Sequence, residues 1–207
     1  MFDRSKYGRV LVPIVTPFAT DESVDHAKLK GLANYLVDKN LADSLILGGS
    51  NGEFFTETFA ERVAVFETVK DAVGARIPLL PHVGCPSTSE TIALAKEAMG
   101  FGFDSAMVVA PYYTRPTAHE LYAHYARIAE AVPALNIMIY NIPTFAGVNV
   151  DPETTGRLAA KYPNIVAIKE EAEHNPKQTT RFLDATPESF VIYNGNNTMI
   201  LEAYSQG

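Results

Sequence analysis

The stretch Ile165-Val166-Ala167-Ile168-Lys169 is an uninterrupted apolar run that ends in a lysine. A run of this length and character is typical of a strand that is buried on both faces of a parallel sheet. At the end of such a strand, burial can lower the pKa of a lysine and free its amine to attack a carbonyl carbon. The alternative interpretation is a solvated lysine that only ends the strand, and the rest of the sequence must decide between the two.

Similar apolar runs recur along the whole chain, and a segment with helix-start signals follows each of them. The predicted strands cover residues 10–14, 44–47, 79–83, 105–109, 136–140, 165–169 and 190–193. Helix starts are predicted at Asp25, before the run 26–39, at the capping-box pairs Thr58/Glu61, Ser87/Glu90 and Thr117/Glu120, at Asp151-Pro152 and Asn175-Pro176, and near Asn197.

Seven strand–helix units in succession predict an α/β protein with an all-parallel sheet. Two architectures fit this pattern, a (β/α)₈ TIM barrel and an open doubly wound sheet. The dinucleotide-binding form of the open sheet lacks support, because Thr16-Pro17-Phe18 follows the first strand in place of a G-x-G-x-x-G fingerprint. Unusual residues also follow many different strands, and a barrel brings all those strand ends to one mouth. We therefore predict a TIM barrel, with residues 1–207 as a single domain.

Composition limits the classes of function. The chain has 207 residues, a formal net charge of −7 and 47% hydrophobic residues, which is enough for one core-bearing domain. The acidic balance argues against nucleic-acid partners and against anionic membrane surfaces. A single cysteine, Cys85, excludes an internal disulfide framework, and no apolar stretch approaches the roughly 20 residues that span a bilayer. A cytoplasmic location without membrane contact is the expectation, and no cluster with metal-ligand spacing appears.

Polar and aromatic motifs follow three of the predicted strands. The first is the glycine-rich turn Gly48-Gly49-Ser50-Asn51-Gly52-Glu53, whose backbone amides could hold a carboxylate, although a tight strand-to-helix turn would look the same. The second is Tyr112-Tyr113, where adjacent tyrosines often serve only packing or an interface. The third is Tyr140-Asn141-Ile142-Pro143, whose phenol is either catalytic or a hydrogen-bonded core group.

These motifs stand in the order Thr16-Pro17-Phe18, turn 49–53, Tyr112-Tyr113, Tyr140-Asn141-Ile142-Pro143 and Ile168-Lys169-Glu170. In this order the chain resembles the dihydrodipicolinate synthase / N-acetylneuraminate lyase family of class I aldolases, from the first strand to Gly195. The resemblance implies a (β/α)₈ barrel that binds pyruvate, or a 2-keto acid that releases pyruvate. It implies no metal and no cofactor beyond a covalent imine with the substrate.

The resemblance also implies roles for individual residues. Lys169 matches the Schiff-base lysine, and Tyr140 matches the tyrosine that shuttles protons to the imine and the bound carboxylate. Ser50 matches a hydroxyl that relays protons and holds the keto-acid carboxylate. Tyr113 matches the tyrosine that completes this relay across a subunit interface, so a homodimer or homotetramer is expected. Gly195 matches a glycine beside the lysine.

Further substrate-binding residues are expected around these groups. The backbone amides of Gly49 and Asn51 would grip the carboxylate together with Ser50, and Thr16 would line the same pocket. Asn51 departs from the family pattern, which has a second threonine there. His82 stands where the family often has glycine; it could contact the distal end of the substrate, or it could be a hydrogen-bonded structural histidine.

Phe145 is the departure that bears on the second substrate. The branch that uses aspartate semialdehyde has an arginine at this position, and Phe145 removes the guanidinium partner of a substrate carboxylate. Residues 48–55 are also similar to branches that act on 2-keto-3-deoxy sugar acids. A dehydratase or aldolase of that kind is therefore the alternative to a dihydrodipicolinate synthase-like aldolase with a small-molecule 2-keto acid substrate.

The length of the sequence leaves a third reading open. Seven strands are predicted, and the eighth strand, its helix and the family's C-terminal helical extension are expected to be missing. A non-catalytic truncated paralogue, or an assembly subunit, is therefore a hypothesis from another class. It predicts that Lys169→Ala causes no loss of function.

Overall fold

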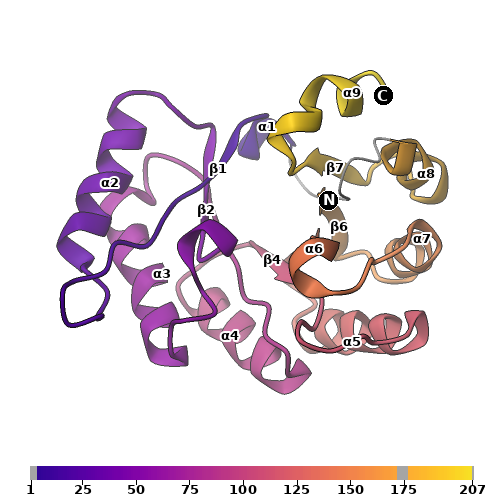
Figure 1. The fold of residues 1–207 in the computed structure, drawn as a ribbon, viewed down its shortest axis with the longest axis horizontal. Coiled ribbons are helices and arrows are strands. Elements are labelled where there is room, and N and C mark those ends of the chain that lie inside the picture. Colours follow the sequence, from indigo (N-terminus) through magenta and orange to yellow (C-terminus); the bar gives the residue numbers. More distant parts are fainter. Residues whose placement is uncertain (1–3, 172–176, 207) are drawn as a thin grey trace. The chain divides into compact units, whose positions relative to one another are not determined.

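The computed structural model describes residues 4–171 and 177–206. The chain divides into two compact units. Unit 1 holds Val83–Ala95 and Asp104–Gly207, and unit 2 holds Asp3–His82 and Lys96–Phe103. Each unit has a parallel sheet with helices packed against it (Figure 1).

Unit 2 is built on a three-stranded parallel sheet with the order β1-β2-β3. Its strands and helices are β1 (Leu11–Pro13), β2 (Ser44–Leu47), β3 (Leu79–Pro81), α1 (Arg4–Tyr7), α2 (His26–Asp38), α3 (Phe59–Val73) and the short 3₁₀ helix η1 (Ser50–Gly52). α2 and α3 lie side by side (Figure 1). The β2 side chains Leu45, Ile46 and Leu47 are almost completely buried and form the centre of this core.

Unit 1 is built on a four-stranded parallel sheet with the order β4-β5-β6-β7. Its elements are β4 (Ser105–Val109), α5 (Ala118–Ala131), β5 (Asn136–Asn141), α6 (Pro143–Ala146), α7 (Pro152–Lys161), β6 (Ile165–Glu170), α8 (Lys177–Ala185), β7 (Val191–Asn194), η2 (Asn197–Met199) and α9 (Ile200–Tyr204). α5, α7 and α8 follow one another along the sheet (Figure 1). α4 (Thr88–Gly100) contributes residues to both units.

The strand order excludes the doubly wound alternative for these two sheets. In each sheet every strand pairs in parallel with the next strand along the chain. A doubly wound sheet instead reverses its strand order at a switch point, and neither sheet contains such a reversal. All seven predicted strands are present, two of them with the predicted bounds and the others shifted by one or two residues at one or both ends.

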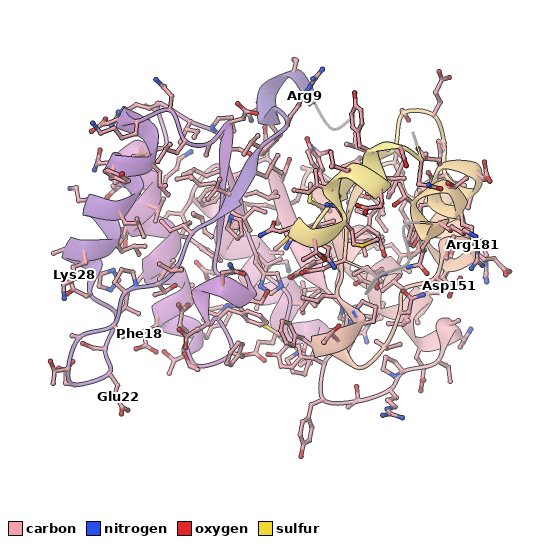
Figure 2. All side chains as sticks on the ribbon, turned by 45° about the horizontal axis from the view of Figure 1, so that its top comes forward. Arg9, Phe18, Glu22, Lys28, Asp151 and Arg181 are labelled. Carbon is pink, nitrogen blue, oxygen red and sulfur yellow. The ribbon has the colours of Figure 1, made fainter. Side chains whose placement is uncertain are left out.

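The predicted helix starts are confirmed wherever the structure describes them. Thr58 and Thr117 each form a complete capping box with the glutamate three residues on. Asp25 and Asp151 also cap their helices; Asp151, labelled in Figure 2, accepts from the backbone N–H of Thr154 at 2.8 Å. The predicted start at Asn175-Pro176 lies outside the described residues. α1, η1 and α6 were not predicted, because helices of three or four residues have no periodic pattern.

None of the helices that the structure describes is long and apolar enough to cross a membrane.

Candidate active site

Lys169 lies near the end of β6, with four buried residues before it. Its side chain is 12% exposed. Burial lowers the pKa of the amine, because a charged ammonium loses hydration in the interior; the Glu171 carboxylate raises the pKa in opposition. The buried lysine predicted from the apolar run is therefore confirmed as a structural feature.

Tyr140 is the register partner of Lys169 on the neighbouring strand β5. Because paired residues of adjacent parallel strands point to the same face, the two side chains meet. The Lys169 Nζ atom lies 4.1 Å from the centroid of the Tyr140 ring, and the Tyr140 hydroxyl donates a hydrogen bond to Glu171 Oε2 at 3.1 Å. Two of the predicted catalytic residues are thus brought together by strand register.

Glu171 completes this group, and the sequence reasoning missed it. Its Oε2 atom lies 3.7 Å from Lys169 Nζ, and its side chain is 27% exposed. Its backbone N–H donates to the carbonyl of Asn141 at 2.9 Å, so the β5–β6 pairing continues one step beyond the strand. The signal was present in the sequence, because a residue two positions after a strand-end lysine lies on the same face as that lysine.

Gly195 follows β7 and lies against the stem of Lys169. A Cβ atom added at Gly195 would lie 2.9 Å from Cε and 3.2 Å from Cγ of Lys169, closer than real side-chain contacts allow. The Gly195 N–H also donates to the carbonyl of Glu170 at 2.7 Å. The absence of a side chain at this position is therefore what leaves room for the lysine.

A buried polar network lies on the other face of the strand ends. Asn141 and Glu170 are register partners one step beyond Tyr140 and Lys169, so they point the opposite way. The Glu170 carboxylate accepts from Asn141 Nδ2 at 2.8 Å and from Gln178 Nε2, in α8, at 2.9 Å. Asn141 Nδ2 also donates to Asn149 Oδ1 at 2.8 Å. This network ties both strand ends and α8 together directly behind the lysine and tyrosine.

Tyr113 and Phe145 are the two predicted site residues of unit 1 with the most exposed side chains. Tyr113 lies between β4 and α5, has a φ of 68° and is 100% exposed. Phe145 lies in α6, directly after β5, and is 69% exposed. Such aromatic groups are available for a substrate or a second copy of the chain, and their roles stay predictions.

The predicted turn and Thr16 come together within unit 2. Ser50 and Asn51 lie in η1, with Gly49 as its N-cap residue. A Cβ atom added at Gly52 would lie 3.2 Å from the Thr16 hydroxyl oxygen and from the carbonyl oxygen of Ile14. Thr16, three residues after β1, is therefore packed directly on the glycine-rich turn.

His82 has the contacts of a structural histidine. Its side chain is fully buried, and its Nδ1 atom lies 2.9 Å from the carbonyl oxygen of Gly48. Arg62 Nη2 donates to the His82 carbonyl at 2.7 Å, and the Phe54 ring packs edge-on at 4.3 Å between centroids. These contacts favour the structural alternative, and the contact of His82 with the distal end of a substrate stays a prediction.

No metal-binding cluster of histidine, cysteine, aspartate and glutamate side chains occurs within residues 4–171 and 177–206. The thiol of Cys85 is buried and lies 3.7 Å from the carbonyl oxygen of Val83.

The fold and this group of side chains define a protein of consecutive parallel βα units with a buried lysine at a strand end. The family model described as the dihydrodipicolinate synthetase family matches residues 6–207. The 4-hydroxy-tetrahydrodipicolinate synthases of Desulforamulus reducens and Bacillus subtilis are 40% and 39% identical to this chain. Each match covers 97% of the chain and 67% or 68% of the relative. The chain therefore belongs to the dihydrodipicolinate synthetase family and spans about two thirds of the length of these relatives.

Solved structures agree with this assignment. The dihydrodipicolinate synthase of Cyanidioschyzon merolae with lysine bound matches 97% of the chain with a TM-score of 0.92 and 37% identity. YagE, a prophage protein of the same family from E. coli K12 in complex with pyruvate, matches 97% of the chain with a TM-score of 0.90 and 26% identity. Each match covers 67% of the solved chain. The predicted family and the predicted barrel fold class are confirmed.

Proposed function

We propose that this chain is a pyruvate-dependent class I aldolase in which the Lys169 amine forms a Schiff base with C2 of pyruvate or of a related 2-keto acid. The observation that carries the proposal is the amine of Lys169, buried at the strand end and in contact with Tyr140 and Glu171. Burial lowers the pKa of this amine, which increases the fraction that can act as a nucleophile near neutral pH.

The chemistry uses the protonated imine formed from the amine as an electron sink. The neutral Nζ atom adds to C2, the carbonyl oxygen leaves as water, and a protonated imine remains. This cation accepts the electrons of the C3–H bond, so that C3 can lose a proton and attack an aldehyde; in the reverse direction it accepts the electrons of the bond between C3 and the aldehyde carbon that leaves. Tyr140 is proposed to move protons to and from the oxygen that becomes water, since its hydroxyl and the Lys169 amine both contact Glu171 Oε2.

The grip on the substrate carboxylate is proposed for the glycine-rich turn 48–53. The resemblance assigns this role to Ser50 and to the amides of the turn, and the short helix η1 with its extended N-cap Gly49 supports it. Amides of successive residues in such a turn can point together at an anion. The proposed relay through Ser50 and Tyr113, and the contact with Thr16, rest on the same resemblance.

A second candidate function is a dehydratase or aldolase that acts on 2-keto-3-deoxy sugar acids. The observation that favours it is Phe145, an exposed apolar ring where the aspartate semialdehyde branch has an arginine. A carboxylate on the second substrate would lack a charge-assisted partner there. Glu171 places a negative charge beside the amine, which is compatible with a hydroxylated substrate and unfavourable for an anionic group on the second substrate.

The test of the proposed function is borohydride trapping of the folded protein with pyruvate, followed by peptide mass mapping. A reduced pyruvate adduct on Lys169 is expected. Lys169→Ala should lose it, and Lys161→Ala, which changes an exposed lysine in α7, should keep it. No adduct on folded protein would contradict the proposal and favour the non-catalytic alternative; screening of aldehydes and sugar acids then distinguishes the two enzyme candidates.

A further inference from the structure

We infer that Glu171 is a further catalytic residue, which moves the protons that imine formation at Lys169 requires and holds the positive charge of the imine. The inference rests on the proposed function and deepens it. Its basis is one carboxylate oxygen, Oε2, that lies 3.1 Å from the Tyr140 hydroxyl and 3.7 Å from Lys169 Nζ.

The position of Glu171 follows from strand geometry. Lys169 and Glu171 are two residues apart, so both point to the face that also carries Tyr140. The backbone of Glu171 is held by its hydrogen bond to the Asn141 carbonyl, which keeps the carboxylate at the strand end. Its side chain is 27% exposed, so the carboxylate is open to a bound molecule as well as to the amine.

The neighbouring glutamate cannot take this role. The Glu170 side chain points to the opposite face, where it is buried and accepts hydrogen bonds from Asn141 and Gln178. Among the described residues, the register partners of Lys169 are Tyr140 in β5 and Tyr193 in β7, and neither carries a carboxylate. Glu171 is the carboxylate that forms an ion pair with Lys169.

The proton transfers balance with one carboxylate. Glu171 first takes a proton from the Lys169 ammonium, which leaves a neutral amine. The amine adds to C2, and the carbonyl oxygen takes the proton back from Glu171, through the Tyr140 hydroxyl. Glu171 then accepts a proton from the nitrogen and returns it as the hydroxyl leaves as water. The sum is ammonium plus ketone giving iminium plus water, with Glu171 ionised at the start and at the end.

The ionised Glu171 carboxylate then stabilises the imine that this step produces. The imine carries a positive charge at the nitrogen, in a place where burial disfavours charge. A carboxylate 3.7 Å from that nitrogen stabilises the cation. Glu171 therefore assists the proton transfers and also stabilises the positive charge that these transfers create.

The experiment compares Glu171→Gln with the wild type and with Glu188→Gln, which changes an exposed glutamate before β7. The first readout is the rate at which borohydride traps the pyruvate adduct on Lys169, measured across pH. The second readout needs no pyruvate: it is the pH dependence with which an amine-acylating reagent modifies Lys169. Glu171→Asp tests whether a carboxylate on a shorter side chain restores part of the rate.

In the expected result, Glu171→Gln slows trapping on the order of a hundredfold or more, which is the usual scale of general acid–base assistance. Its Lys169 also titrates at lower pH, because burial is no longer opposed by the carboxylate. Glu188→Gln behaves as the wild type. Thermal unfolding of each variant shows that it is folded.

Three results overturn the inference or its basis, and they are distinguishable. If the wild type and Glu171→Gln trap pyruvate at the same rate with the same pH profile, Glu171 has no catalytic role, while the proposed function stands. If folded wild type traps no pyruvate at all, the proposed function fails and the catalytic role of Glu171 fails with it. An unchanged titration of Lys169 in Glu171→Gln would overturn the ion pair itself.

Discussion

At the scale of single residues, the amine of Lys169 is held between two opposing influences. Burial disfavours its ammonium form, and the Glu171 carboxylate favours it. The Tyr140 ring, 4.1 Å from Nζ, also attracts a cation. A nucleophilic amine that later becomes a cationic imine needs both tendencies, because the free amine must be accessible and the imine must be stable.

Gly195→Ala tests how tightly the lysine is positioned. The new methyl group would lie 2.9 Å from Cε of Lys169, so the lysine side chain must move. We expect the rate of pyruvate trapping to fall about tenfold or more, because small displacements of a reacting group are costly. The measurement is the trapping rate, with the free energy of unfolding measured in parallel.

Gly31→Ala is the matched control for that substitution. Gly31 lies inside α2, and no atom lies within 4 Å of the Cβ position there. This variant should trap pyruvate normally and be more stable by about 0.5–1 kcal/mol, the usual gain for alanine inside a helix. Equal trapping by Gly195→Ala and wild type would show that the lysine tolerates the displacement.

At the scale of secondary-structure elements, the polar network behind the site fixes the register of the strand ends. Asn141 and Glu170 join β5 to β6, and Gln178 joins both to α8. All three side chains are buried, so each hydrogen bond replaces one that water would otherwise make. Lys169 and Tyr140 lie on the opposite face of the same two strands. The network therefore also fixes the register of these two residues.

Gln178→Ala should therefore destabilise unit 1. It removes the amide that donates to Glu170 Oε1 and leaves a buried carboxylate oxygen short of a partner. We expect a loss of about 1–3 kcal/mol in the free energy of unfolding, measured by urea denaturation. Lys177→Ala, an exposed neighbour, should change little; a comparable loss in both variants would indicate an effect of the α8 start rather than of the network.

Thr117→Ala should weaken the start of α5. The Thr117 hydroxyl accepts from the N–H of Glu120, and the Glu120 carboxylate accepts from the N–H of Thr117 at 2.7 Å. Loss of the hydroxyl should cost about 1 kcal/mol in urea denaturation. Thr117→Ser, which keeps a hydroxyl, should recover most of that stability, and failure to recover it would point to the lost methyl group instead.

At the scale of the whole molecule, stability and assembly are the properties to consider. Stability in unit 1 depends on pH through His124, which is buried in α5 with Nδ1 2.8 Å from the Thr88 hydroxyl of α4. Its Nε2 atom is buried without a hydrogen-bond partner among the described residues. Burial, aided by the nearby Arg127, lowers the pKa of His124 to about 4.

The sign of the pH effect follows from that lowered pKa. The unfolded chain binds a proton at His124 near pH 6.5, whereas the folded chain binds it only near pH 4. Folding is therefore disfavoured as pH falls between these values, by about 2 kcal/mol near pH 5 relative to neutral pH. Urea denaturation of the wild type and of His124→Gln across pH checks this; the glutamine variant should lose this part of the pH dependence, and parallel curves would contradict it.

The second whole-molecule property is assembly. Our prediction about assembly concerns Tyr113. Its side chain is fully exposed in the single chain, as expected for a group that packs against a second copy. If it does, Tyr113→Ala should weaken the homodimer or homotetramer by about 2 kcal/mol or more, on the scale of interface anchor residues. Light scattering during size exclusion measures this, with Tyr35→Ala, an exposed tyrosine of α2, as control. Unchanged assembly and trapping in Tyr113→Ala would contradict the prediction.

The sequence by itself determined the seven strand–helix units, most helix starts and the candidate nucleophile. Apolar runs, capping pairs such as Thr58 with Glu61, and a lysine at the end of 165–169 express local chemistry, which a linear pattern records. Short elements such as η1 and α6 were missed, because their few residues carry no period.

Only the tertiary structure decided which side chains share the environment of Lys169. The contacts of Tyr140 and Gly195 with the lysine depend on the register of β5 and β7 against β6, and register is a property of paired strands rather than of any one segment. The burial of His82 among Gly48, Arg62 and Phe54 was decided in the same way, by elements that meet only after folding.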